Sequence, residues 1–201
     1  MHSNILNADK SYSVYLPDGY DTATERFPVL YLLHGAFGQD NNWHKMGNLQ
    51  PQADEAIKEG RVRPMIVVMP DARGTAENLA GDNMGYFNVE GWNYEDFFFE
   101  EFIPHIDATF KTLSDKENRA IAGLSMGGGQ SWSIGLKHPE VLSNIGILSS
   151  GMFGGVTYAP FDLAKEVPEL LADPQAFNDN LDVFYISCGE TDPRITHTQT
   201  A

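Results

Sequence analysis

Short apolar runs that read as β-strands alternate along this chain with longer segments of helical period, and few folds accommodate such an order. Strands that alternate with helices form a mostly parallel sheet covered by helices on both faces. The run Val-Leu-Tyr-Leu-Leu at residues 29–33 is apolar throughout, as expected of a strand buried on both faces. The fold class is therefore predicted to be α/β, with Pro104 kinking one helix. The expected strands lie near residues 12–16, 29–33, 65–69, 120–122, 145–148 and 183–187, and the expected helices near 52–60, 94–111 and 126–137.

The length and charge of the chain exclude several classes of protein. A chain of 201 residues, 42% of them apolar, can bury about 70% of its unfolded surface in one core, so we expect a single domain over residues 1–201. Lys and Arg total 13 against 28 Asp and Glu, and the net charge of −15 would repel nucleic acid and anionic membrane surfaces. No apolar run approaches the roughly 18 residues of a membrane span, and the first residues lack the pattern of a signal peptide. We therefore expect a soluble protein with no nucleic-acid or membrane partner.

Metal and cofactor sites are not recognisable in the sequence. The lone Cys188 excludes an internal disulfide and a cysteine-built zinc site, and it leaves the compartment open. No cluster with metal-ligand spacing and no phosphate-binding glycine loop is present, so no metal and no cofactor are predicted.

The sharpest chemical signal is the motif Gly123-Leu124-Ser125-Met126-Gly127, which stands between an apolar strand and a Gly-rich, then helical, segment. A chain that turns this tightly tolerates little but glycine at the flanking positions, and the turn presents the serine oxygen at the carboxyl end of the sheet. The alternative is that Ser125 only starts a helix. The strand before the motif and the helix after it favour Ser125 as a catalytic nucleophile.

A second signal is the His34-Gly35 turn that ends the strand at residues 29–33. Such a turn can supply a backbone N–H to an oxyanion hole, where two fixed amides stabilise the charge of a tetrahedral intermediate. The amides of Ala36 and Met126 are the candidates, with Phe37 as the alternative to Ala36. Because the chain order for this chemistry is Ser, acid, His, we interpret His34, which precedes Ser125, as a residue that fixes the turn.

Through these motifs and several further segments, the sequence resembles the esterase-D-like α/β-hydrolases, especially carbohydrate esterases of the feruloyl and acetyl-xylan type. The resemblance covers essentially the whole chain. It is carried by residues 13–21 (SVYLPDGYD), 28–35 (PVLYLLHG), 64–71 (PMIVVMPD), 119–129 (RAIAGLSMGGG), 135–140 (GLKHPE) and 186–192 (ISCGETD).

The resemblance implies an α/β-hydrolase fold and a serine esterase that acts through an acyl-enzyme on feruloyl or acetyl esters of plant polysaccharide. It implies Ser125 as the nucleophile, Asp192 as the acid of the triad, and Ala36 and Met126 as the oxyanion amides. It also favours a secreted or periplasmic location. A thioesterase similar to S-formylglutathione hydrolase, or an acyltransferase, would use the same residues.

The residues themselves also favour Asp192 as the acid. It follows a β-rich run and a glycine at the carboxyl end of the last visible strand, and Pro193 biases it toward an extended conformation. The alternative is an Asx turn before the proline. Asp71 and Asp162 are the other carboxylates at strand ends or in loops, and Asp71 is disfavoured because it precedes the serine.

The sequence departs from the family at the catalytic histidine, which in the family lies some tens of residues beyond the acid. Of the six histidines only His197 follows Asp192, and its surroundings resemble the start of the next helix. We therefore expect a fragment that lacks the final strand, histidine loop and last helix, is nearly inactive on aryl esters and self-associates through an exposed edge strand at residues 183–187. His197 as the base, and a non-catalytic module that binds carbohydrate or a partner, are the alternatives.

The substrate side is expected in the Gly- and Asn-rich segment at residues 74–91, which reads as a long loop. Aromatic and amide side chains between Asn83 and Trp92 suit a sugar or a phenolic acyl group, although they could equally be packing residues.

Overall fold

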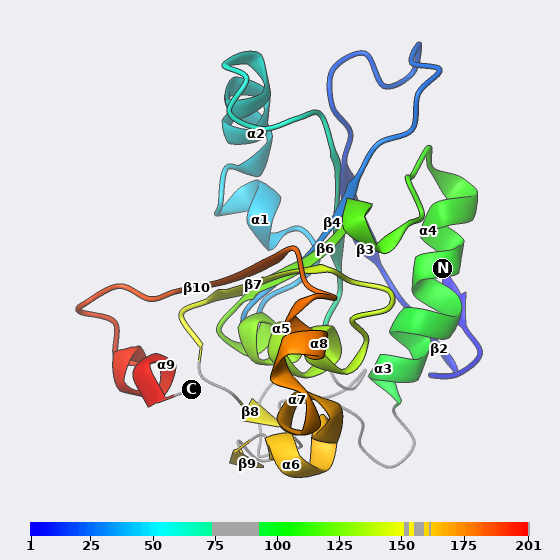
Figure 1. The fold of residues 1–201 in the computed structure, drawn as a ribbon. Helices are drawn as coiled ribbons and strands as arrows, with labels where there is room; N and C mark the ends of the chain where they lie inside the picture. Colours follow the sequence, from blue (N-terminus) through cyan, green and yellow to red (C-terminus); the bar gives the residue numbers. More distant parts are fainter. Residues whose placement is uncertain (74–92, 151–152, 155–158, 161, 201) are drawn as a thin grey trace.

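The protein is described by a computed structural model that covers residues 1–73, 93–150, 153–154, 159–160 and 162–200. Its centre is a six-stranded sheet in the order β10-β7-β6-β4-β5-β3 (Figure 1). All neighbouring strands run parallel except β3, which pairs antiparallel with β5. The α/β prediction is thereby confirmed. The sheet strands are β3 (Tyr12–Tyr15), β4 (Val29–Leu33), β5 (Ile66–Pro70), β6 (Arg119–Leu124), β7 (Asn144–Leu148) and β10 (Val183–Ser187).

Helices and short hairpins surround this sheet. Strands β1 and β2 form one small two-stranded sheet, and β8 and β9 form another. In the described part of the chain no helix is both long and apolar enough to cross a bilayer. The remaining elements are β1 (His2–Ser3), β2 (Ala8–Asp9), β8 (Phe153–Gly154), β9 (Ala159–Pro160), α1 (Asn42–Lys45), α2 (Leu49–Lys58), α3 (Tyr94–Asp96), a π-helix (Phe97–Phe102), α4 (Ile103–Thr109), a 3₁₀-helix (Lys116–Asn118), α5 (Met126–Lys137), α6 (Leu163–Glu166), α7 (Pro168–Ala172), α8 (Pro174–Asn178) and α9 (Ile195–Thr200).

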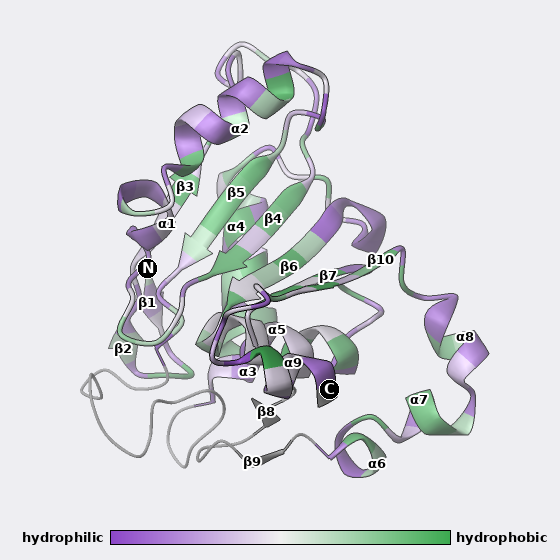
Figure 2. Ribbon diagram, turned by 90° about the vertical axis from the view of Figure 1, so that its left-hand side faces the viewer, coloured by the Kyte–Doolittle hydropathy of each residue, from purple (hydrophilic) through white to green (hydrophobic). Residues whose placement is uncertain are grey.

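The sheet carries helices on both faces, as the strand pattern predicts. On one face, Leu32 and Val67 pack against apolar side chains of α1 and α2, among them Trp43 and Ile57. Figure 2 shows the central strands as largely hydrophobic and α2 as largely hydrophilic, which is the pattern of a helix that covers a sheet with one face only. The other face packs against α5 and the helices between residues 94 and 109.

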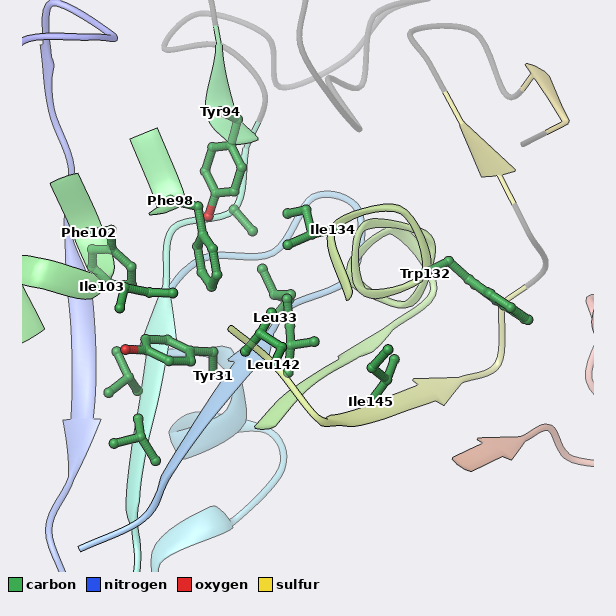
Figure 3. Packing of buried hydrophobic residues seen from close by; sticks show 14 of the residues in the cluster. Tyr31, Leu33, Tyr94, Phe98, Phe102, Ile103, Trp132, Ile134, Leu142 and Ile145 are labelled. Carbon is green, nitrogen blue, oxygen red and sulfur yellow. The ribbon is translucent and has the colours of Figure 1, made fainter. Parts of the chain in front are cut away.

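The larger core is built around aromatic rings. Tyr31 of β4 is fully buried and meets Phe98 at a ring-centre distance of 5.2 Å in an edge-to-face arrangement (Figure 3). The expected helix at residues 94–111 is present as α3, the π-helix and α4 in succession. The irregularity expected at Pro104 takes the form of a π-turn just before it, where Ile103 N–H donates to Phe98 O. The wider turn accommodates a proline that has no N–H to donate.

Strand β10 forms one edge of the sheet, where β7 is its only strand partner among the described residues. Its residues Val183, Phe184, Tyr185 and Ile186 are between 37% and 55% exposed. Val183 and Tyr185 also line a hollow of about 300 Å³ over the sheet face that carries Ala122. An apolar edge strand with unpaired backbone groups can add a strand from another molecule.

We therefore expect a chain of residues 1–201 to self-associate through β10. Tyr185→Glu should shift it toward monomer, because a new sheet pairing would have to bury the unpaired carboxylate. Met46→Glu is the matched control, since Met46 is 82% exposed and lies outside β10. Size-exclusion chromatography with light scattering measures the outcome. A monodisperse monomer before any substitution would contradict the expectation.

Candidate active site

Ser125 occupies the sharp turn between β6 and α5. Its backbone angles are φ 56° and ψ −110°, a region that side-chain-bearing residues rarely adopt. The Ser125 N–H donates to Leu148 O of β7 at 2.9 Å, and Gly129 N–H donates to Ser125 O at 3.0 Å. Such strain costs on the order of 1–3 kcal/mol and persists only where the surroundings enforce it. This geometry is that of a nucleophile elbow, which places a serine at the carboxyl edge of the sheet.

The glycines of the motif are required by close backbone packing. A Cβ on Gly123 would lie 2.2 Å from the carbonyl carbon of Gly127. A Cβ on Gly127 would lie 2.7 Å from the carbonyl oxygens of Leu33 and His34. The elbow is thus pressed against the end of β4, and both flanking positions exclude a side chain.

Gly127→Ala is expected to lower both stability and activity, because the new methyl group would push the elbow away from β4. Overpacking of this kind costs about 1–3 kcal/mol, and thermal unfolding measures it. Gly189→Ala is the control, since a Cβ there meets nothing nearer than Asp192 Cβ at 3.9 Å. Equal unfolding temperatures for the two variants would contradict the packing argument.

The His34-Gly35 turn lies directly beside the elbow. A Cβ on Gly35 would be 3.7 Å from Ser125 Cβ, so the peptide that carries the Ala36 N–H adjoins the serine. Met126 is the first residue of α5, where N–H groups have no acceptor within the helix. Phe37, the alternative to Ala36, has φ 62° and is 70% exposed. The structure therefore brings the amides of both Ala36 and Met126 close to Ser125.

His34 is 1% exposed, and both of its ring nitrogens are engaged. Its Nδ1 lies 2.7 Å from Gly35 O and donates to it, while its Nε2 accepts the N–H of Ala72 at 3.0 Å. Because neither nitrogen is available to Ser125, the geometry agrees with a residue that fixes the turn.

Asp192 follows β10, with β7 between β10 and the strand that leads to Ser125. Two strand spacings are roughly 10 Å, a gap that an imidazole between serine and carboxylate could bridge. The Asp192 carboxylate accepts the Arg194 N–H at 2.8 Å, which is the Asx turn expected as the alternative. This backbone hydrogen bond, together with contacts to Ser149 and the Arg194 side chain, lowers the pKa of Asp192 from its usual value. Forming the Asx turn therefore does not prevent Asp192 from serving as the acid of a triad.

The other two carboxylates have structural partners. Asp71, at the end of β5, is 5% exposed and binds the Arg73 guanidinium at 2.7 Å and Lys10 at 3.5 Å. Burial opposes its ionisation, but its contacts with His34, Arg73 and Lys10 hold the pKa of Asp71 well below its usual value. Asp162 is the N-cap of α6, where it accepts the N–H groups of Ala164 and Lys165.

The histidines other than His197 lie on other elements. His105 bonds to Tyr12 at 2.8 Å, and His138 contacts Glu95 at 3.0 Å at the end of α5. His197 lies on α9, whose Thr198 hydroxyl donates to Ser150 O at 2.8 Å and so holds this helix next to the end of β7.

The substrate residues expected between Asn83 and Trp92 lie outside the described residues. Within the described ranges, no group of three or more His, Cys, Asp or Glu side chains is placed to hold a metal ion.

Gln130 of α5 is a candidate functional residue that the sequence motifs do not predict. Its side chain is fully buried, and its Nε2 donates to Ala72 O at 2.8 Å. The signal available in the sequence was one amide among the Gly, Ser and apolar residues that follow Ser125.

Comparison with known proteins adds to this geometry. The sequence profile of a family described as "Putative esterase" matches residues 3–201. An endo-1,4-beta-xylanase/feruloyl esterase of Xylanibacter ruminicola is 36% identical over 182 residues, which cover 89% of this chain and 22% of that protein. Endo-1,4-beta-xylanase Y of Acetivibrio thermocellus is 27% identical over 177 residues, or 83% of this chain and 15% of that one. The chain thus spans less than a quarter of the length of either relative.

Two solved structures have similar backbones. A ferulic acid esterase matches with a TM-score of 0.82 and 28% identity, covering 99% of this chain and 80% of its own. An S-formylglutathione hydrolase of Staphylococcus aureus matches with a TM-score of 0.64 and 20% identity, covering 94% of this chain and 77% of its own. At that lower identity the second likeness concerns the fold alone.

Proposed function

Because this chain belongs to the esterase family and has the α/β-hydrolase fold, we propose that it is a serine carboxylic-ester hydrolase that acts through an acyl-enzyme. The observation that carries the proposal is the strained backbone of Ser125, held between the Gly35 turn and the first turn of α5. A strained turn that presents a serine hydroxyl beside two N–H groups suits acyl transfer, because the same turn places the nucleophile and the oxyanion donors together.

In the proposed mechanism, the Ser125 hydroxyl attacks the ester carbonyl while a general base takes its proton. The N–H groups of Ala36 and Met126 bind the oxyanion of the tetrahedral intermediate. The intermediate expels the alcohol, which receives the proton, and the acyl group remains on Ser125. Water then attacks the acyl-enzyme by the same route and releases the acid. Asp192 would orient the base and stabilise its charged form, and His197 is the candidate base in the described part of the chain.

For the substrate we propose feruloyl or acetyl esters of plant polysaccharide. Support comes from the names of the relatives, which include a feruloyl esterase joined to a xylanase and a solved ferulic acid esterase. A thioesterase or an acyltransferase would use the same serine and the same amides, so the acceptor and leaving group must be identified by experiment.

The test compares methyl ferulate, p-nitrophenyl acetate and an S-acyl glutathione thioester as substrates, with labelling of Ser125 by a fluorophosphonate probe. The assays use the full-length gene product. The proposal expects the gene product to hydrolyse the oxygen esters and its Ser125→Ala variant to resist labelling. Faster turnover of the thioester would favour the thioesterase, and absence of labelling in the gene product would favour a non-catalytic binding module.

A further inference from the structure

Ala72, just beyond β5, is held on both sides by side chains from the two halves of the candidate site. Its N–H donates to His34 Nε2 at 3.0 Å, and its carbonyl accepts from Gln130 Nε2 at 2.8 Å. His34, Ala72 and Gln130 are each no more than 1% exposed, so water does not compete for these bonds. A continuous hydrogen-bonded chain therefore runs from the turn after β4 through Ala72 to helix α5.

One end of this hydrogen-bonded series helps to fix the direction of an oxyanion donor, together with the Gly38 N–H, which donates to Gly35 O at 3.0 Å. His34 Nδ1 donates to Gly35 O, and that carbonyl belongs to the same planar peptide unit as the Ala36 N–H. In a trans peptide the C=O and N–H point in opposite directions, so fixing the Gly35 carbonyl fixes the direction of the Ala36 N–H. The other end is Gln130, about one turn along α5 from Met126, whose N–H is the second donor.

Only one of the two polar atoms of the buried Gln130 amide has a partner among the described residues. Among the described residues no donor faces its Oε1, although the side chain is fully buried. A buried amide oxygen without a partner is costly, and an apolar side chain of similar length would avoid that cost. The Nε2 bond to Ala72 is the contact that an apolar residue could not make.

We propose that Gln130 is a positioning residue for ester hydrolysis: through Ala72 and His34 it holds the Ala36 N–H at a fixed place relative to α5, Met126 and Ser125. This inference rests on the proposed function, because the Ala36 N–H matters only if it binds the oxyanion of ester hydrolysis. It assigns Gln130 no contact with substrate. The oxyanion forms only as the reaction proceeds, so a displaced Ala36 amide lowers kcat and leaves ground-state binding unchanged.

The test measures kcat and KM for p-nitrophenyl acetate and methyl ferulate in the full-length gene product. Gln130→Met removes the donor and keeps the length, and Gln130→Glu keeps the shape and replaces the donor by a carboxylate. For either variant we expect kcat to fall roughly 10- to 100-fold, with KM changed by less than about threefold, and fluorophosphonate labelling to slow in parallel. Using both variants keeps the test decisive where one of them fails to fold.

Ile134→Val is the matched control, since Ile134 is fully buried on the same helix and belongs to the core cluster. It should lower the unfolding temperature and leave kcat unchanged. A loss of kcat in Ile134→Val equal to that in Gln130→Met, or a Gln130 effect confined to KM, would overturn the positioning role. A kcat within about twofold of that of the unsubstituted protein in both Gln130 variants would also overturn the positioning role. If Ser125→Ala also retains full turnover, the proposed function itself fails, so the two failures are distinguishable.

Discussion

Replacing Ser125 by alanine is expected to lower kcat for ester hydrolysis in the full-length gene product by roughly 10⁴- to 10⁶-fold. The reason is that alanine has no hydroxyl to form the acyl-enzyme, while the amides of Ala36 and Met126 stay in place. The residual rate would be that of water attack assisted by the oxyanion hole alone. Steady-state kinetics measure the effect, and mass spectrometry tests for loss of the fluorophosphonate adduct. Near-normal turnover would refute Ser125 as the nucleophile.

The backbone of Ser125 supplies a matched control for that experiment. Because φ is 56° there, Ser125→Gly should also be inactive and yet more stable than Ser125→Ala, by about 1 kcal/mol. Glycine adopts this conformation without the steric cost that alanine pays. Inactive variants whose stabilities differ in this order would separate the loss of chemistry from any loss of fold. An alanine variant that is the more stable of the two would contradict the strain.

Much of the fold could be predicted from the sequence because it follows from local patterns. The apolar runs at residues 29–33 and 65–69 became β4 and β5, and the aromatic residues near 94–111 became the buried face of one helical segment. The elbow at Ser125 was predictable for the same reason. Its glycines, its preceding strand and its following helix all lie within a few residues of one another.

The rest depends on contacts between distant residues or on weak local signals. The bonds of Ala72 to His34 and Gln130 span 38 and 58 residues, and no local pattern specifies them. The short helices α6, α7 and α8 were not predicted, because two of them start at prolines and none is long enough to show a clear helical period. The π-helix before Pro104 could be anticipated only as an irregularity, since the wider turn is one of several ways to accommodate a proline.

Asp192→Asn is expected to lower kcat by about 10⁴-fold in the full-length gene product. Asparagine keeps an oxygen that can accept the Arg194 N–H, so the turn after β10 should persist and only the charge is removed. The acid acts by orienting the base and stabilising its protonated form, and a neutral amide does neither well. KM should change little, because Asp192 binds no part of the ester in the proposed mechanism.

Asp162→Asn is the matched control for this acid. Asp162 caps α6 with a side-chain oxygen that asparagine also provides, so stability and kcat should both remain near normal. If Asp162→Asn is crippled while Asp192→Asn is not, the acid has been misassigned. His197→Ala completes the set: a loss of turnover comparable to that of Asp192→Asn would identify His197 as the base that Asp192 orients. Full turnover in His197→Ala would mean that Asp192 orients a base other than His197.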